Sequence, residues 1–325
     1  RTFTVEGNAS QLDLAHPIPM AAETSFDLAS LTKIVATVGT LMATDSQWSL
    51  DDRVGKYLPQ WNGSDKFEIT IRHLLQHRSG LLPWLPLYIR HSEPESAHAF
   101  IANHPLENRV DEIRRYSDLG FITLGKIIES ITGESIETAA KKYVFDSFGM
   151  KQTQFAKPLT PAASTSRGDR FEYEMVRTDT PYVVEEEVSE FSGWRKEILT
   201  GEINDGNSFH LFKGVSAHAG LFSTANDLIQ FCESITPSLT FKKLISESRD
   251  EGAHIGFKSW NSEIGNCSTN FYGHTGFTGT ALAISPEHGA SLVLLTNRLH
   301  TDGEVPATED LIQIALREFH AHLHG

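Results

Sequence analysis

The sequence predicts an α+β fold, in which an antiparallel sheet built from both ends of the chain and flanked by helices packs against an inserted, mostly helical region. A short strand pattern at 2–6 opens the chain, and apolar residues at helical spacing fill its middle. The last third holds apolar runs separated by turns, followed by one amphipathic helix. With 325 residues, of which 39% are hydrophobic, the chain can bury a substantial core.

Apolar periodicity and capping residues locate the individual elements. Ser135, and Ser223 or Thr224, can cap two helices, and Gly133 ends another. The segment 158–212 shows little periodicity, and a binding loop and a surface insertion both fit it. Helices are expected at 30–44, 70–77, 119–131, 135–148, 225–235 and 309–322. Strands are expected at 254–260, 270–274, 280–285 and 290–296, with a turn at 286–289.

The composition disfavours several classes of partner. The chain has 28 Lys and Arg against 42 Asp and Glu, for a net charge of −14. A chain this acidic gains nothing from counterion release on nucleic acid, and its apolar runs are shorter than the ~20 residues of a membrane span. Its two cysteines, Cys232 and Cys267, provide neither a disulfide framework nor a thiolate metal site. We therefore expect neither a nucleic-acid partner nor a transmembrane segment.

Ser30 and Lys33 form a Ser-x-x-Lys pattern at the start of the first predicted helix. Residues three apart share a helix face, and the helix N-terminus places partial positive charge beside Ser30. If burial lowers the pKa of Lys33, its amine can take the Ser30 proton and make that hydroxyl a nucleophile. The alternative is an ordinary helix start followed by an exposed lysine.

Tyr116 and Asp118 stand just before the helix expected at 119–131. A tyrosine beside a lysine can be held partly as phenolate and act as a general base. Asp118 can hydrogen-bond Lys33 or a substrate. In the alternative interpretation, Tyr116 packs a loop and Asp118 caps the following helix.

The triplet His274, Thr275 and Gly276 lies at the end of a predicted strand. A substrate carboxylate or carbonyl can dock along such a strand, and Gly276 lets a ligand approach the backbone closely. The N–H of Phe277 can then pair with that of Ser30 as an oxyanion hole. A plain turn after a strand is the alternative.

Taken together and in this order, the three motifs resemble those of the penicillin-recognising serine hydrolases, above all class C β-lactamases, the related DD-peptidases and the esterases of the same fold. The resemblance covers 1–325 and is weakest at 158–212. It implies a β-lactamase/transpeptidase-like fold with one catalytic unit over 1–325, a sheet part at 1–45 and 254–325, and a mostly helical part at 46–253. Further segments that resemble the family are Phe26–Ala29, Arg72–Leu81, Ala219–Thr224 and Gly273–Leu282.

The resemblance also implies the roles of the site residues. Ser30 would be the nucleophile, Lys33 and Tyr116 would manage its proton, and the N–H groups of Ser30 and Phe277 would form the oxyanion hole. Trp84 lies on a proline-bracketed loop that members of this family place at the mouth of the active site, where it can wall the acyl pocket or cover the core. We expect no metal and no organic cofactor. Substrate binding is expected from Asp118, His274, Thr275, Gly276 and Trp84.

Two departures from the family pattern bear on the substrate. Asp118 occupies the position of the asparagine in the family's Tyr-x-Asn motif. His274 occupies the position of the lysine in the family's Lys-Thr-Gly motif. Because histidine is only partly charged near neutrality, a β-lactam or peptide carboxylate loses a reliable partner. We therefore expect a serine hydrolase that cleaves an ester or amide through a Ser30 acyl-enzyme, carboxylesterase-like and with weak or no β-lactamase activity.

Two alternatives remain open at this point. One is a D-Ala carboxypeptidase, penicillin-binding protein or β-lactamase acting on cell-wall peptides or β-lactams, and the other is an inactive binding protein on the same fold. The expected partner is accordingly a small ester, a β-lactam or a D-aminoacyl peptide. The first residues show no signal-peptide pattern, which favours the cytoplasm over export. The family usually has a helix and a strand before 2–6, so a truncated N-terminus is expected.

Overall fold

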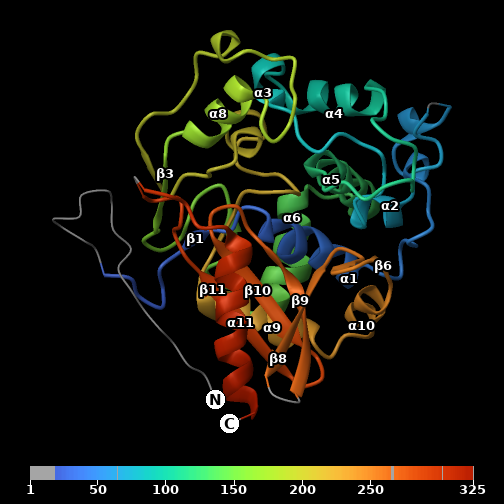
Figure 1. Ribbon diagram of the computed structural model, residues 1–325. Helices are drawn as coiled ribbons and strands as arrows, with labels where there is room; N and C mark the ends of the chain where they lie inside the picture. The colour runs from blue at the N-terminus through green and yellow to red at the C-terminus, as the bar shows by residue number, and fades with distance from the viewer. Residues whose placement is uncertain (1–18, 64, 265–266, 302, 325) are drawn as a thin grey trace.

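The computed structural model describes residues 19–325 except 64, 265–266, 302 and 325 (Figure 1). The strand predicted at 2–6 lies outside the described residues. No helix among those described is both long and apolar enough to cross a membrane.

The C-terminal part of the chain forms an antiparallel meander in which each strand pairs with its neighbour in sequence. The predictions for the last two strands agree with the structure to within one residue. The strand predicted at 254–260 is instead divided by a turn, where Gly256 adopts a φ of 76°. The strands are β6 (Ser248–Asp250), β7 (Ala253–His254), β8 (Lys258–Ile264), β9 (Cys267–Thr275), β10 (Thr280–Ser285) and β11 (Ala290–Leu295).

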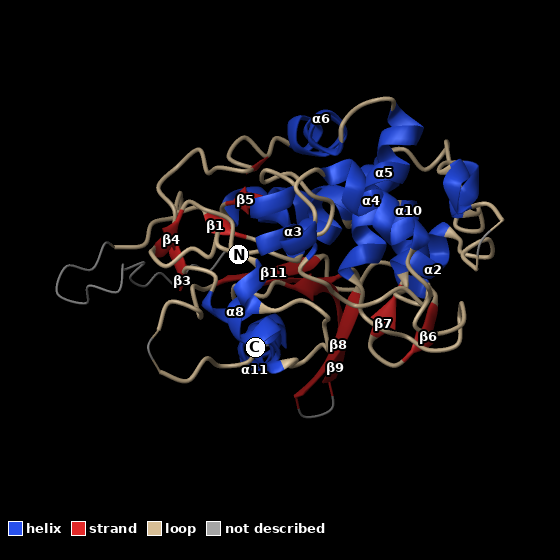
Figure 2. Cartoon of the chain, turned by 90° about the horizontal axis from the view of Figure 1, so that it is seen from above, coloured by secondary structure: helices blue, strands red, loops and turns tan. Residues whose placement is uncertain are grey.

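Strand β10 is buried on both faces and ties the two layers of the molecule together. Side chains alternate along a strand, so Leu282 and Ile284 join the main core with the helices. Ala281 and Ala283 face the other way and pack against α11 (Thr308–His324). Figure 2 shows α11 on one side of the sheet and most of the helical region on the other. The sheet is therefore covered by helices on both faces, as predicted.

The helices predicted before the sheet are all present. Ser117 caps α5 by accepting from Gly120 N–H, so the expectation that Asp118 is the cap is wrong. The predicted helix at 30–44 has a π-helical first part, η1 (Lys33–Val38), which continues as α1 (Gly39–Ala43). The other α- and π-helices before the sheet are α2 (Ile71–Leu75), α3 (Leu87–Arg90), α4 (Pro94–Asn103), α5 (Asp118–Thr132), α6 (Ile136–Ala140), η4 (Lys141–Phe145), α7 (Asp146–Phe148), α8 (Arg170–Thr178), η6 (Asn207–Leu211), α9 (Ala225–Ile235) and α10 (Leu239–Ser246).

Two small sheets connect distant segments around the start of η1. In the first, β1 (Phe26–Asp27) pairs with β5 (Leu221–Ser223), which also pairs with β2 (Gln154–Phe155). In the second, β3 (Ser164–Arg167) pairs with β4 (Ile198–Thr200), and α8 lies between them in the chain. The segment 158–212 is thus ordered by its own short strands and helix, which sequence periodicity did not reveal.

Candidate active site

A cavity of about 680 Å³ opens between the end of β9, the start of α5 and the segment 158–212. This volume is within the range of small-molecule sites. The cavity brings together residues that are far apart in sequence. The sequence-predicted residues that line it are Ser30, Trp84, Tyr116, Asp118, His274, Thr275, Gly276 and Phe277.

Ser30 stands at a strained turn that a buried aspartate holds. Ala29 has a φ of 45°, in the left-handed region that costs a non-glycine residue about 1–3 kcal/mol. Its N–H donates to Asp27 Oδ1 (2.9 Å), while Asp27 Oδ2 accepts from Asn204 N–H (2.7 Å). Burial raises the pKa of Asp27 to about 6, although these two donors favour the carboxylate. Asp27 therefore holds the turn that directly precedes Ser30.

Lys33 is completely buried one helical turn beyond Ser30. Its Nζ lies 2.8 Å from Ser30 Oγ and 2.7 Å from Asp118 Oδ1, and it donates to the His218 carbonyl at 3.1 Å. Burial is the largest single effect and favours the neutral amine, but Asp118 and Tyr116 together outweigh it, through charge and hydrogen bonds, and raise the pKa of Lys33. Lys33 is an ammonium ion in the free protein. The condition set from the sequence, that burial lowers the pKa of Lys33 overall, is not met, because the sequence did not show how close Asp118 lies.

Tyr116 packs between Lys33 and two histidines. Its ring centre lies 5.0 Å from Lys33 Nζ, 4.4 Å from the His77 ring and 5.9 Å from the His274 ring. Burial raises the pKa of Tyr116, and the opposing effects of Lys33 and Ser30 do not reverse this shift. The side chain is thus a neutral phenol in the free protein, and the expectation of a partial phenolate is wrong.

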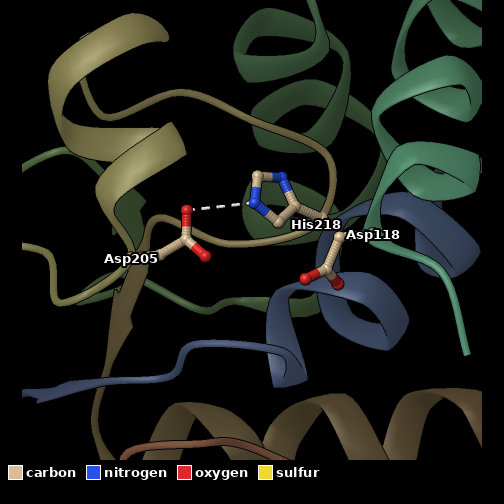
Figure 3. A group of neighbouring side chains, drawn as sticks. All are labelled: Asp118, Asp205 and His218. Carbon is tan, nitrogen blue, oxygen red and sulfur yellow. Dashed lines mark hydrogen bonds and ion pairs between the residues drawn. The ribbon is translucent and has the colours of Figure 1, made fainter. Parts of the chain in front are cut away.

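Asp118, Asp205 and His218 place three potential metal ligands within 4.8 Å of one another (Figure 3). His218 Nε2 is 3.0 Å from Asp205 Oδ1, and His218 Nδ1 is 2.7 Å from Ser216 Oγ. Carboxylates and imidazole are ordinary ligands of a divalent metal, but Asp118 is already paired with the Lys33 ammonium. A metal ion here would have to displace that cation. Asp118 pairs with Lys33, and Asp205 pairs with His218. We therefore interpret the three residues as part of the network of charged groups around Lys33.

His274 is buried, and its Nδ1–H donates to the Thr275 carbonyl at 2.7 Å. Burial, together with the positive charges of Lys258 and Lys33, holds the pKa of His274 well below its usual range. The imidazole is therefore neutral. Beside it, Lys258 on β8 reaches the Thr275 hydroxyl with its Nζ at 3.0 Å. No motif in the sequence marks Lys258, whose position opposite β9 depends on strand pairing.

The backbone at Gly276 forms part of the cavity wall, which Ser30 also lines. Gly276 N–H donates to the Thr280 carbonyl at 2.6 Å, and a Cβ at this position would overlap the Leu28 carbonyl oxygen and the Thr280 hydroxyl. The glycine is thus required by the packing of the protein itself, whereas from the sequence we expect it to admit a ligand. Within the part of the chain that the structure describes, no protein acceptor takes the N–H of Ser30 or of Phe277.

The profile of the family described as Beta-lactamase matches residues 4–317. The chain belongs to the β-lactamase family. It is 29% identical to the N-acetylmuramyl-L-alanine amidase of Bacillus subtilis, covering 89% of this chain and 71% of that protein. It is 27% identical to a putative D-alanyl-D-alanine carboxypeptidase of Escherichia coli K12, and the match covers 89% of this chain and 72% of that protein.

Solved structures agree with this family assignment. A class C β-lactamase from Rhodobacter sphaeroides matches with a TM-score of 0.64 at 19% identity, over 97% of this chain and 90% of that one. A penicillin-binding protein from Bacillus halodurans matches with a TM-score of 0.65 at 17% identity, over 95% of this chain and 91% of that one. The predicted β-lactamase/transpeptidase-like fold is confirmed. The protein is therefore an enzyme, a serine hydrolase of the β-lactamase family.

The segment 158–212 of this β-lactamase-family enzyme supplies one side of the cavity. Glu172 on α8, Tyr182, Asn204 and Asp205 all line it. The Tyr182 ring lies 6.3 Å from that of Trp84, which is buried and also lines the cavity. Trp84 is thus buried and also part of the cavity wall, so it combines the two alternatives raised from the sequence. The segment 158–212 has the position of a binding loop. Glu172 and Asp205 lie in a stretch where no sequence signal marked them.

Proposed function

We propose that this β-lactamase-family hydrolase cleaves an amide bond of a cell-wall-type peptide through an acyl-enzyme on Ser30. The observation that carries the proposal is Lys33, whose buried Nζ contacts Ser30 Oγ at 2.8 Å and Asp118 Oδ1 at 2.7 Å at the edge of the cavity. Both relatives named above are described as acting on such peptides or amides. Because the cavity takes residues from the sheet and from the helical part, we treat 1–325 as one catalytic unit.

The charge states of the free enzyme determine how the nucleophile is formed. Lys33 is an ammonium ion and Tyr116 a neutral phenol, so neither group is a free base. As Ser30 Oγ attacks the carbonyl carbon, its proton passes to Lys33, which gives one of its own protons to the Asp118 carboxylate. The N–H groups of Ser30 and Phe277 stabilise the oxyanion. Lys33 keeps its charge throughout, and Asp118 becomes neutral.

Collapse of the tetrahedral intermediate needs a proton on the leaving amine. Tyr116 gives its hydroxyl proton to the amine nitrogen and recovers one from Lys33, which takes back the proton that Asp118 held. Water then attacks the acyl-enzyme, and its proton follows the same route until Ser30 leaves as a free hydroxyl. Each proton is returned, so the cycle regenerates the starting enzyme.

Carboxylesterase activity is the second candidate. The observation that favours it is the neutral His274, which leaves no fixed positive charge at this buried position beside Tyr116. An activated ester also needs no proton on its leaving group, so the same Ser30 chemistry would cleave it. A p-nitrophenyl ester is therefore a useful probe for either function.

The test compares wild type with Ser30→Ala on p-nitrophenyl butyrate, on an N-acyl-D-Ala-D-Ala peptide and on N-acetylmuramyl-L-alanine. Loss of the nucleophile should lower kcat by about 10³-fold or more and abolish labelling by a fluorophosphonate. The exposed Ser147 provides the control Ser147→Ala, which should behave as wild type. Turnover that survives Ser30→Ala would refute the mechanism. A wild type that neither turns over nor labels would indicate an inactive binding protein, and ester turnover alone would favour the esterase.

A further inference from the structure

One buried histidine has a backbone conformation that most side chains avoid. His77 directly follows Gln76, the C-cap of α2, and has a φ of 57°. Its N–H donates to the Leu74 carbonyl at 3.1 Å, and Arg78 N–H donates to the His73 carbonyl at 2.8 Å, which is the Schellman pattern that ends many helices. Glycine is the usual residue at this left-handed position, because a side chain there is strained. The chain has histidine instead, which directs attention to the contacts of the imidazole.

His77 contacts Tyr116 and both of its neighbours in the chain. The His77 carbonyl accepts from Arg115 N–H at 2.8 Å, and its ring nitrogen Nδ1 accepts from Ser117 N–H at 3.0 Å. The His77 ring packs on the Tyr116 ring, with 4.4 Å between the ring centres and 36° between the planes. It also contacts the ring of Phe121 on α5, at 5.2 Å between centres. One residue thus contacts the main chain on both sides of Tyr116 and the ring between them.

His77 is neutral in the free protein. Burial holds the pKa of this imidazole well below its usual range, and the positive charges of Arg114, Lys33 and Lys258 act in the same direction. A neutral imidazole has one nitrogen that accepts and one that donates, whereas an imidazolium ion has no acceptor. Since Nδ1 accepts from Ser117 N–H, the proton is on Nε2. The hydrogen bond to the main chain thus needs the neutral histidine that this environment provides.

Tyr116 needs an accurate position for its part in the proposed mechanism. Its hydroxyl gives a proton to the leaving group and recovers one from Lys33, so it has to come within hydrogen-bond reach of both. A displacement of about 1 Å is enough to slow such a step about 10²-fold. Tyr116 lies just outside α5, whose N-cap is Ser117, so its position depends on contacts with other segments. The contacts from His77 are of this kind.

We propose that His77 is a positioning residue, which keeps the Tyr116 hydroxyl where it can protonate the leaving group by accepting Ser117 N–H at its Nδ1. This inference rests on the proposed function, in which Tyr116 is the proton donor. Tyr116 lines the cavity, whereas His77 is not among the lining residues and acts only through Tyr116. Loss of the Nδ1 acceptor should therefore slow those reactions whose leaving group needs a proton and spare the others.

The test compares leaving groups that differ in their need for a proton. p-Nitrophenolate leaves without one, whereas ethoxide and an amine need one. His77→Phe keeps an aromatic ring but removes the acceptor. It should lower kcat/KM about 10- to 100-fold on ethyl butyrate and on an N-acyl-D-Ala-D-Ala peptide, and less than about threefold on p-nitrophenyl butyrate.

Two further variants serve as rescue and control. The side-chain oxygen of asparagine can accept the same N–H, and asparagine tolerates the left-handed turn, so His77→Asn should stay within about fivefold of wild type on all three substrates. His98→Phe makes the matched change at a histidine on α4, which packs on Phe212 with 5.6 Å between ring centres, and should leave all three rates unchanged. An asparagine variant as slow as His77→Phe would contradict the role of the acceptor.

A double-mutant cycle separates positioning from a general structural role. Tyr116→Phe should lower kcat/KM on ethyl butyrate about 10²-fold or more. Adding His77→Phe should lower it less than about threefold further, because no phenol remains to be positioned. Losses that multiply in the double variant, or equal losses of His77→Phe on the two esters, would overturn the role of His77. Failure of the proposed function has a different signature, namely ester turnover and fluorophosphonate labelling that do not depend on Ser30. A wild type that cleaves p-nitrophenyl butyrate but neither ethyl butyrate nor the peptide would overturn both, since Tyr116 would then donate no proton.

Discussion

Lys33 Nζ lies 2.7 Å from Asp118 Oδ1, so the ammonium ion beside the candidate nucleophile is neutralised by a carboxylate from the first turn of α5. Lys33 is fully buried, and the side chain of Asp118 is 15% exposed. An unpaired buried ammonium would lose its proton readily, whereas this pair keeps Lys33 charged. In the proposed mechanism, Asp118 thereby decides which group can receive the proton of Ser30.

Asp118→Asn should change the pH dependence of the enzyme. Without the carboxylate, burial of Lys33 is opposed by less negative charge, so its pKa falls. The variant then needs the neutral Lys33 amine as its base, and its kcat/KM should rise with pH as Lys33 deprotonates. At pH 6 we expect kcat/KM about 10- to 100-fold below wild type, with the difference shrinking above pH 8. The measurement is a pH profile of kcat/KM on an N-acyl-D-Ala-D-Ala peptide.

The control for this experiment is Asp146→Asn, which removes an exposed carboxylate paired with Lys141. It should keep the wild-type profile. An Asp118→Asn variant with an unchanged profile, lowered equally at every pH, would contradict the assignment of Asp118 as the proton acceptor.

Asp27→Ala should destabilise the protein and slow the reaction of Ser30. The substitution leaves the N–H groups of Ala29 and Asn204 without their acceptor, at about 1–3 kcal/mol each. The Ala29 turn is then no longer held at its positive φ, and the Ser30 side chain loses its direction. Urea unfolding measures the first effect, and the rate of fluorophosphonate labelling measures the second. Labelling at the wild-type rate in a destabilised variant would show that Asp27 has a structural role only.

Gly276→Ala should lower activity strongly, because the new methyl group would overlap the Leu28 carbonyl and the Thr280 hydroxyl. Overpacking of this kind costs about 1–3 kcal/mol, and it moves the Phe277 N–H away from the oxyanion. We expect kcat to fall about 10²-fold or more. Gly303→Ala is the matched control, since its Cβ would meet only Thr301 Oγ1 at 3.6 Å. If both variants have wild-type kcat, the contact at Gly276 does not position the oxyanion hole.

Glu172 should make the protein less stable as the pH rises. Burial raises its pKa from 4.5 to about 8 in the folded state. The folded protein therefore holds an extra proton between these values, and the stability it confers is complete below pH 4.5 and lost as the pH passes through about 8. The slope is at most about 1.4 kcal/mol per pH unit. Glu172→Gln, which stays neutral, should flatten the dependence of the free energy of unfolding on pH.

Urea unfolding between pH 5 and 9 measures this slope. Glu174→Gln on the same helix is the control, because Glu174 is exposed and pairs with Arg177. It should keep the wild-type slope. If Glu172→Gln and wild type lose stability in parallel, the folded state does not hold a proton on Glu172.

The elements that the sequence predicted well are those with a strong local pattern. The helix at 119–131 has a continuous apolar face and ends at Gly133, which adopts a φ of 71°. The strand at 280–285 is apolar throughout because both of its faces are covered. Helices α3, α4, α8 and α10 were not predicted, and the 254–260 strand was predicted as continuous. In these segments the local sequence pattern is weak. Tertiary contacts, such as those of Glu172 on α8 with Tyr88 and Gly206, also stabilise the observed structure.

By itself, the sequence determined which residues are the candidates for the chemistry, since Ser30, Lys33, Tyr116 and the His274 triplet stand in recognisable order and spacing. Only the tertiary structure decided their charge states. A pKa depends on burial and on charges within a few ångströms, and these distances arise when α5, β8 and β9 meet around η1. Thus Lys33 is charged because Asp118 reaches it, His274 is neutral because it is buried near two lysines, and Lys258 enters the cavity because β8 pairs with β9.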